Sequence, residues 1–202
     1  MRKLAFCCII FMLLFPAAAF GQSSAIHTVK PGDSMWKIAV RYQVGLSELI
    51  KANPHIKNPA LIYPNQKITI PAISEKNFEA QVVQLVNQKR REAGLKPLTH
   101  NWELSRVARY KSMDMRDRNY FSHDSPTYGS PFTMIKNFGI YYRNAAENIA
   151  QGQATPAAVM QSWMNSPGHR KNILSAQYTQ IGVGYISGGT GRHYWTQMFI
   201  SQ

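Results

Sequence analysis

The chain has 202 residues, of which 45% are hydrophobic and 16% are charged, and this composition is that of a globular protein and excludes a disordered one. Its 23 Lys and Arg against 10 Asp and Glu give a formal net charge of +13, which favours anionic partners such as wall teichoic acid, phosphorylated glycans or lipid head groups. Nucleic acid is disfavoured as that partner, because the chain begins with an export signal and no expected helix carries a dense Lys/Arg stripe.

Residues 1–21 are predicted to be a secretory signal peptide. Arg2 and Lys3 form a positive start, residues 4–15 are a continuous apolar run, and small residues over 17–21 offer cleavage sites. The apolar run is too short to span a membrane, and no other segment is apolar enough to do so. We therefore expect a secreted protein without a transmembrane segment after signal removal, with a retained N-terminal anchor as the alternative.

Both cysteines, Cys7 and Cys8, lie inside the predicted signal peptide. The mature chain is therefore expected to have no thiol, no disulfide and no cysteine ligand for zinc. Eukaryotic secreted domains of this size often carry disulfides, so the pattern fits a bacterial exported protein better.

Residues 26–71 are predicted to form a small βααβ module. Polar and apolar residues alternate over 27–30 and again over 66–71, which predicts two strands. Between them, apolar residues recur at helical spacing over 35–42 and 46–50, which predicts two helices.

Three stretches of this module, VKPGDSMWKIA, LIKANP and IYPNQKITIP, resemble a LysM domain. The resemblance implies binding of N-acetylglucosamine-containing glycan, as in peptidoglycan or chitin. It implies a groove between the first strand–helix loop and the loop before the last strand, lined by Gly32, Asp33, Ser34 and Met35 on one side and by Ile56, Leu61 and Ile62 on the other. For Met35 and Ile62, core packing is an equal alternative. Asn65 replaces the usual glycine of the closing turn, and because Asn tolerates positive φ we expect the turn to be kept.

Residues 72–77 form a short polar linker, and residues 78–202 are predicted to form a larger module. Apolar residues recur at helical spacing in four of its segments, 78–93, 104–115, 131–139 and 156–164. Alternation over 181–185 and 194–200, with glycines between them, predicts a β-hairpin near the C-terminus.

The basic side chains of the expected helices are predicted to face solvent and not to form a binding patch. They are the run at 87–91 and the arginines Arg106, Arg109, Arg116 and Arg118.

Three motifs within residues 121–174 carry the groups best suited to chemistry: FSHDSP, AENIA and WMNSPGHRKNIL. Each contributes one side chain able to bind a metal ion or move a proton, namely His123, Glu147 and His169. Their spacings match no compact metal motif such as HExxH. The alternative is therefore that the histidines are ordinary surface or core residues and that Glu147 caps a backbone turn. Trp163 is expected in the core.

The three motifs, in this order, resemble the bacterial branch of the CAP superfamily, which includes cysteine-rich secretory proteins, antigen 5 and pathogenesis-related 1 proteins. The resemblance covers residues 78 to the C-terminus and implies an α/β/α sandwich with a cleft lined by two His and two acidic residues. His123, Glu147 and His169 match three of these positions. The fourth, three residues after Trp163, is Ser166. The expected fold class is therefore α+β, a small βααβ LysM domain plus an α/β/α sandwich CAP domain.

Two functional hypotheses remain open for the cleft. In the first, the LysM domain binds wall peptidoglycan and the cleft binds a partner, a lipid or a divalent metal ion. That ion would be Zn²⁺ or another divalent metal, weakly held by His123 and His169 with Glu147 acting through a water. In the second, His123, Glu147 and His169 are the catalytic groups of a wall hydrolase, with Ser125 and Ser166 as candidate hydroxyls.

The binder is favoured because the mature chain has no thiol and Ser166 removes a second carboxylate. In either case we expect a secreted protein that is retained on the cell wall or the spore envelope.

Overall fold

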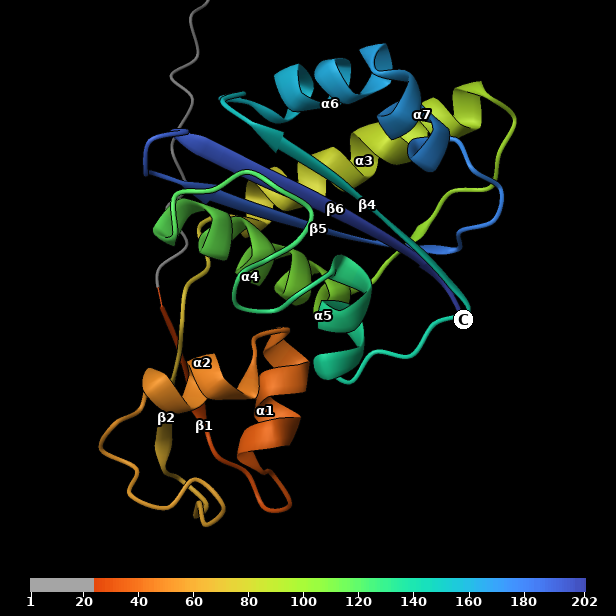
Figure 1. The fold of residues 1–202 in the computed structure, drawn as a ribbon. Coiled ribbons are helices and arrows are strands. Elements are labelled where there is room, and N and C mark those ends of the chain that lie inside the picture. The colour runs from red at the N-terminus through yellow and green to blue at the C-terminus, as the bar shows by residue number, and fades with distance from the viewer. Residues whose placement is uncertain (1–23) are drawn as a thin grey trace, which may run out of the picture.

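The computed structural model describes residues 24–202, which form a small module over residues 25–70 and a larger one from Lys76 onward (Figure 1). The predicted signal peptide lies outside the described residues. In the described part of the chain, no helix combines the length and the apolar character needed to cross a bilayer.

The small module has the predicted βααβ order. Its elements are β1 (Ala25–Thr28), α1 (Met35–Tyr42), α2 (Leu46–Lys51) and β2 (Lys67–Ile70), and β1 pairs antiparallel with β2. Ile38, Leu49 and Ile68 are fully buried at the centre of its core. The hydroxyl of Ser34 caps α1 by accepting a hydrogen bond from the amide of Lys37. Asn65 has a φ of 71°, which confirms that Asn takes the place of glycine in the closing turn.

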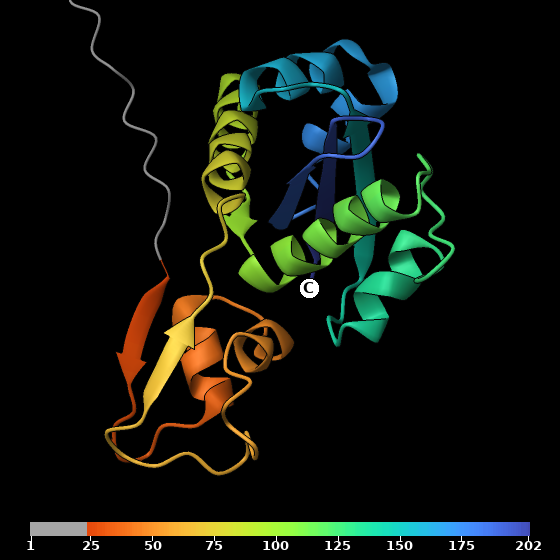
Figure 2. The ribbon, with the colours of Figure 1, turned by 90° about the vertical axis from the view of Figure 1, so that its left-hand side faces the viewer.

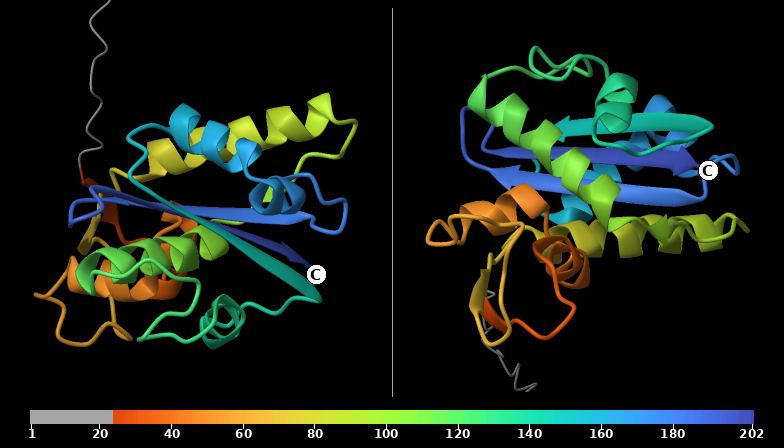
Figure 3. Two further views of the ribbon diagram at one scale, coloured as in Figure 1. Left: turned by 45° about the horizontal axis from the view of Figure 1, so that its top comes forward. Right: turned by 90° about the horizontal axis from the view of Figure 1, so that it is seen from below.

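The larger module is an α/β/α sandwich. Its elements are α3 (Lys76–Glu92), β3 (Thr99–His100), α4 (Trp102–Asp117), α5 (Pro131–Asn137), β4 (Asn144–Gln151), α6 (Pro156–Asn165), α7 (Pro167–Ile173), β5 (Gln180–Ser187) and β6 (His193–Ser201). The sheet order is β3-β5-β6-β4, with β3 and β5 parallel and the other neighbours antiparallel. Helices α3, α6 and α7 cover one face, and α4 and α5 cover the other (Figure 3). The predicted α+β class and both domain architectures are therefore confirmed, and β4 lies at an edge of the sheet.

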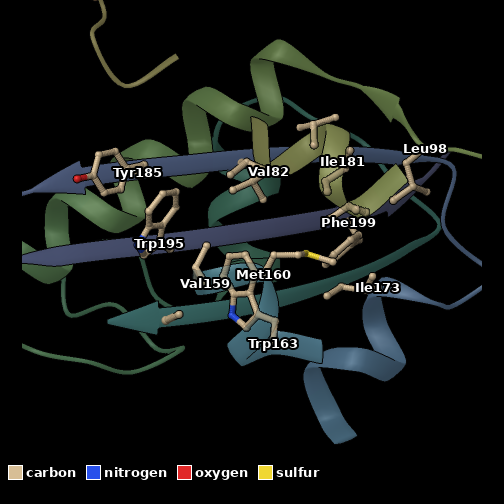
Figure 4. Packing of buried hydrophobic residues seen from close by; sticks show 14 of the residues in the cluster. Val82, Leu98, Val159, Met160, Trp163, Ile173, Ile181, Tyr185, Trp195 and Phe199 are labelled. Atoms are coloured by element: carbon tan, nitrogen blue, oxygen red, sulfur yellow. The ribbon is translucent and has the colours of Figure 1, made fainter. Parts of the chain in front are cut away.

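The two faces of the sheet are packed in different ways. On the α3 and α6 face, Trp163 is fully buried in one cluster with Trp195 and Phe199, as expected for a core tryptophan (Figure 4). On the other face, α4 crosses β5 so closely that a Cβ on Gly182 would lie 2.3 Å from the backbone of Leu104. A side chain there would push α4 away from the sheet. This glycine therefore fixes the helix from which the site loop departs.

Of the arginines that were expected to face solvent, Arg90 is buried and Arg109 has a side chain that is only 12% exposed. Arg90 is 2% exposed, and its guanidinium donates hydrogen bonds of 2.8–2.9 Å to three backbone carbonyls, those of Lys96, Ile173 and Ser175. Arg109 forms a bidentate pair with the buried Glu79, at 2.7 and 2.5 Å. Buried polar groups need partners, and these partners come from segments that the spacing within one helix does not reveal.

The two modules contact each other beside α4 (Figure 2). Arg106 donates to Oε1 of Glu48 at 3.0 Å and to the hydroxyl of Ser47 at 3.0 Å. At the start of α3, the ammonium of Lys76 donates to the carbonyl of Tyr42 at 3.1 Å. A cavity of about 120 Å³ beside the ion pair is lined from both modules by residues that include Trp36, Leu46, Trp102 and Phe138. Side chains of both modules therefore join them, in addition to the linker.

Candidate functional site

His123, Glu147 and His169 meet at the outer edge of the sheet. Glu147 lies in the middle of β4, His123 in the loop between α4 and α5, and His169 in α7. Nδ1 of His123 is 2.7 Å from Oε1 of Glu147. The Glu147 side chain is only 1% exposed, whereas that of His123 is 53% exposed. The imidazole therefore covers a buried carboxylate and remains accessible from solvent.

The two imidazoles have opposite pKa shifts. The hydrogen bond to Glu147 raises the pKa of His123, because the carboxylate stabilises the imidazolium. Burial lowers the pKa of His169, and the charge of His123 lowers it further. Burial raises the pKa of Glu147, although the bond to His123 opposes that shift. At neutral pH, His169 is thus the imidazole better suited to accept a proton or a metal ion, and His123 the one better suited to hold a proton.

Lys111 of α4 lies beneath the site and was missed by the sequence analysis. It is fully buried, and its ammonium donates to the carbonyl of His123 at 2.6 Å and to the hydroxyl of Tyr120 at 3.2 Å. Its charge also favours the ionised form of Glu147. A signal was available, because Lys111 follows Val107 by one helical turn and so falls on the apolar stripe of α4.

Asp114, one turn further along α4, fixes the loop that carries His123. It accepts hydrogen bonds from the hydroxyls of Ser125 at 2.6 Å, Thr127 at 2.5 Å and Tyr120 at 2.8 Å. These bonds hold the pKa of Asp114 below its ordinary value, against the effect of its burial. Ser125, a candidate nucleophile by sequence, thus directs its hydroxyl to a carboxylate and not to a histidine.

Side chains join helices α6 and α7 to the outer edge of β4. The indole nitrogen of Trp163 donates to the carbonyl of Ile149 at 3.2 Å. Nδ2 of Asn172 donates to Oδ1 of Asn148 at 2.8 Å, and Nδ2 of Asn148 donates to the carbonyl of His169 at 3.1 Å. The second and third motifs are therefore bonded to each other, and these bonds hold the backbone of α7 at His169 against β4. Ser166 lies at the junction of α6 and α7 and makes no side-chain cap there.

The donor set for a metal ion at this site is small. Residues 24–202 contain no group of three or more His, Cys, Asp or Glu side chains arranged to hold a metal ion. Oε1 of Glu147 is bonded to His123, and Oε2 is buried without a hydrogen-bond partner among the described residues. Two imidazoles exclude a closed structural zinc, which needs four protein ligands. The unpaired Oε2 is suited to orient a water.

The residues predicted to bind glycan lie in two adjacent loops of the LysM-like module, except Met35, which begins α1. The amide of Val29 donates to the carbonyl of Gln66 at 2.9 Å, which brings the two loops together. Gly32 and Leu61 are exposed there, Ser34 and Ile62 are half-buried, and Met35 and Ile56 are buried in the core. The carboxylate of Asp33 is bonded to His27, Arg41 and the amide of Lys30, and the pKa of Asp33 is lowered to about 2, chiefly by that amide.

Two family models match the chain. The model of the Cysteine-rich secretory protein family (CAP) matches residues 83–199, and the LysM domain model matches residues 27–71. YkwD of Bacillus subtilis (strain 168) is 51% identical over 150 residues, which are 74% of this chain and 57% of YkwD. The membrane protein YlbC of the same organism is 34% identical over 149 residues, which are 70% of this chain and 42% of YlbC.

A solved structure also resembles the chain. An extracellular protein containing a SCP domain from Bacillus anthracis superposes with a TM-score of 0.58 at 34% identity, over 69% of this chain and 47% of that one. The chain thus spans about half the length of these relatives.

Proposed function

The chain belongs to the cysteine-rich secretory protein (CAP) family and carries a LysM domain ahead of the family domain, and from this premise we propose that it is a cell-wall-associated protein. The LysM domain binds peptidoglycan through its N-acetylglucosamine units. It thereby positions the CAP domain, whose cleft at His123, Glu147 and His169 binds a partner, a lipid or a divalent metal ion. The protein is exported through the signal peptide of residues 1–21 and retained on the wall.

The observation that carries this proposal is the position of the two candidate glycan loops. Both lie at the end of the LysM domain that points away from the CAP domain (Figures 1 and 2). Gly32 and Leu61 are exposed there, and Leu61 is 53% exposed although it is a large apolar residue. A glycan strand can therefore reach these loops without meeting the CAP domain. Backbone amides and an exposed aliphatic side chain are suited to an acetamido group.

The cleft supports a binding role more than a hydrolytic one. Ser125, a candidate hydroxyl in the loop that carries His123, is 6% exposed and donates to Asp114. Ser166 stands where the family pattern has an acidic residue, so the cleft has a single carboxylate, Glu147. Hydrolysis usually depends on a nucleophile aimed by a base or on a pair of carboxylates. The described residues of this site provide neither arrangement.

Sedimentation with insoluble peptidoglycan tests wall binding by the full mature chain at high salt, where charge attraction to wall polymers is screened. We expect Leu61→Asp to weaken retention by about tenfold, or about 1.4 kcal/mol. Phe132→Asp is the matched control, because Phe132 in α5 of the CAP domain is 47% exposed, and it should be retained like the wild type. Equal retention of all three proteins would overturn the proposal.

A hydrolase is the second candidate, and the opposed pKa shifts of His123 and His169 favour it, because they resemble an acid and base pair. Incubation of the protein with purified peptidoglycan, followed by analysis of soluble fragments, separates the two functions. A binder releases none. Fragments that appear with the wild type and disappear with His169→Ala would establish the hydrolase.

A further inference from the structure

A groove of about 570 Å³ begins at His169 and follows the outer edge of β4. Residues 149–153 form one wall, and Ser162 and Trp163 of α6 line it as well. The hairpin between β5 and β6 bounds it through residues 190–192, and Phe121 lies among its lining residues. No other strand of the described chain pairs with this edge of β4. The volume lies within the usual range of ligand sites, about 300–1,000 Å³.

The hairpin is held firmly against the strand. A Cβ at Gly191 would lie 2.3 Å from Nε2 of Gln151, so the two elements touch. The carbonyl of Arg192 accepts a hydrogen bond from the amide of Gly188 at 2.8 Å, and the amide of Arg192 donates to the carbonyl of Gly189 at 3.2 Å. Arg192 is thereby fixed at the end of the groove, with its backbone in the left-handed region at a φ of 62°.

The groove offers a cation and amide groups but no acid. None of its lining residues is Asp or Glu, and Arg192 is exposed and forms no ion pair with the described residues. Oε1 of Gln153 is buried without a hydrogen-bond partner in residues 24–202. A buried acceptor in this state requires an N–H or O–H from a ligand or a water. The site therefore suits a ligand that carries both a carboxylate and amide donors.

Side chains of α6 and α7 occupy part of the outward backbone of β4 along this edge. The carbonyls of Glu147 and Ile149 point outward and already accept hydrogen bonds from Asn172 and Trp163. Because strand residues alternate, the next outward position is Gln151. The five positions from residue 149 to 153 span about 13 Å, the length of a few extended residues.

We propose that this groove binds the stem peptide of peptidoglycan, with a free carboxylate of the peptide at Arg192 and its amides at Gln151 and Gln153. The proposal rests on the proposed function, since wall binding through the LysM domain brings the stem peptides close to the CAP domain. The glycan itself fits less well, because N-acetylglucosamine is neutral and offers no anion to Arg192.

Calorimetric titration of the full mature chain with a soluble synthetic stem tetrapeptide tests this site. We expect Arg192→Gln to weaken binding by about tenfold, the effect of losing one charge-assisted hydrogen bond. Arg192→Lys should retain part of the affinity for the peptide, because it keeps the positive charge. Arg143→Gln is the matched control, because Arg143 is exposed just before the other end of β4, and it should bind like the wild type.

The same tetrapeptide with its carboxylates amidated completes the test. It should bind the wild type and Arg192→Gln equally, because no anion remains for the guanidinium. Absence of peptide binding to the wild type, or equal binding of the acid form to the wild type and Arg192→Gln, would overturn the proposal. Leu61→Asp should bind soluble N-acetylglucosamine oligomers about tenfold more weakly than the wild type and bind the peptide equally well. Failure of oligomer binding alone would therefore refute LysM-based retention and not the peptide groove.

Discussion

At the scale of single residues, the site combines one buried carboxylate with two imidazoles in different environments. Glu147 holds His123 through Nδ1, which leaves Nε2 of that ring for a ligand. A carboxylate behind a histidine is the arrangement that orients metal-binding imidazoles in many proteins. Lys111 stabilises the charge of Glu147 from below. Each of these roles can be tested by one substitution.

The first prediction concerns metal binding by the two histidines. We expect weak Zn²⁺ binding that is lost in His123→Ala and His169→Ala, reduced in Glu147→Gln and tightened in Ser166→Glu, which restores a carboxylate. Binding requires neutral imidazoles, so it weakens as pH falls. Glu147 raises the pKa of His123 above 6.5, the ordinary value for histidine, so this ring becomes protonated at a higher pH than an ordinary histidine.

Titration calorimetry with Zn²⁺ on the wild type and the two His→Ala variants measures this. Equal heats for all three would contradict metal binding. If the three residues only join the loops by hydrogen bonds, His123→Ala would lower the melting temperature equally with and without added metal.

The second prediction concerns Lys111. Lys111→Met leaves the carbonyl of His123 and the carboxylate of Glu147 without a buried cation, and we expect a loss of about 2 kcal/mol in the free energy of unfolding. The pKa of His123 should rise further, because the charge of Lys111 opposes its protonation. Chemical denaturation and NMR titration of His123 measure the two effects. Lys171→Met, at an exposed site on α7, is the control. An unchanged pKa of His123 in Lys111→Met would show that Lys111 stabilises the fold but does not influence the site.

At the scale of the elements, the sheet edge is shaped by the helices that follow β4. Trp163 and Asn172 donate hydrogen bonds to two carbonyls of β4 that would otherwise be free to pair with another strand. This protects the edge near the histidines from strand pairing with another chain, while Gln151 further along lines the groove. The second and third motifs are thus one structural unit.

The third prediction concerns Arg90 of α3, whose guanidinium holds the segments at Lys96 and at Ile173 and Ser175. Arg90→Met leaves these carbonyls without donors, and we expect a loss of about 3 kcal/mol, or about 6–12 °C in melting temperature for a protein of this size. Arg91→Met changes the exposed neighbour in the same helix. This variant should shift the melting temperature by less than about 2 °C. Thermal unfolding followed by circular dichroism compares them, and equal melting temperatures would refute the role of Arg90.

At the scale of the whole molecule, the LysM domain is held beside α4 of the CAP domain. The ion pair of Arg106 with Glu48 is about one quarter exposed on each side, at 25% and 27%. Partly exposed pairs contribute little to stability, on the order of 1 kcal/mol or less. The pair therefore matters more for the orientation of the two domains than for their unfolding.

The fourth prediction follows from this contact. Arg106→Gln should leave the melting temperature nearly unchanged but let the LysM domain reorient independently, which ¹⁵N relaxation detects as separate tumbling times for the two domains. Arg116→Gln, on the same helix and paired with Asp117 within it, should leave the tumbling unchanged. A single common tumbling time in Arg106→Gln would contradict this role and show that the remaining contacts, which include the bond from Lys76 to the carbonyl of Tyr42, suffice to hold the domains.

Local patterns in the sequence determined most of the helices, the C-terminal hairpin and much of the domain architecture, but they did not predict β3, β4 or α7. Periodicity predicted both helices of the LysM domain, Asn65 was readable as a residue with positive φ, and three motifs named His123, Glu147 and His169. These features depend on the few neighbouring residues that set dihedral angles and faces. The position of Lys111 on the apolar stripe of α4 was the one sequence signal for a buried cation, and only the tertiary structure decided which partners the buried polar groups have. Arg90 bonds to carbonyls up to 85 residues away, and Arg109 and Lys111 bond to groups outside their helix. The groove at Arg192 likewise forms only when the hairpin packs against β4, because a buried charge or a ligand site needs partners that distant segments supply.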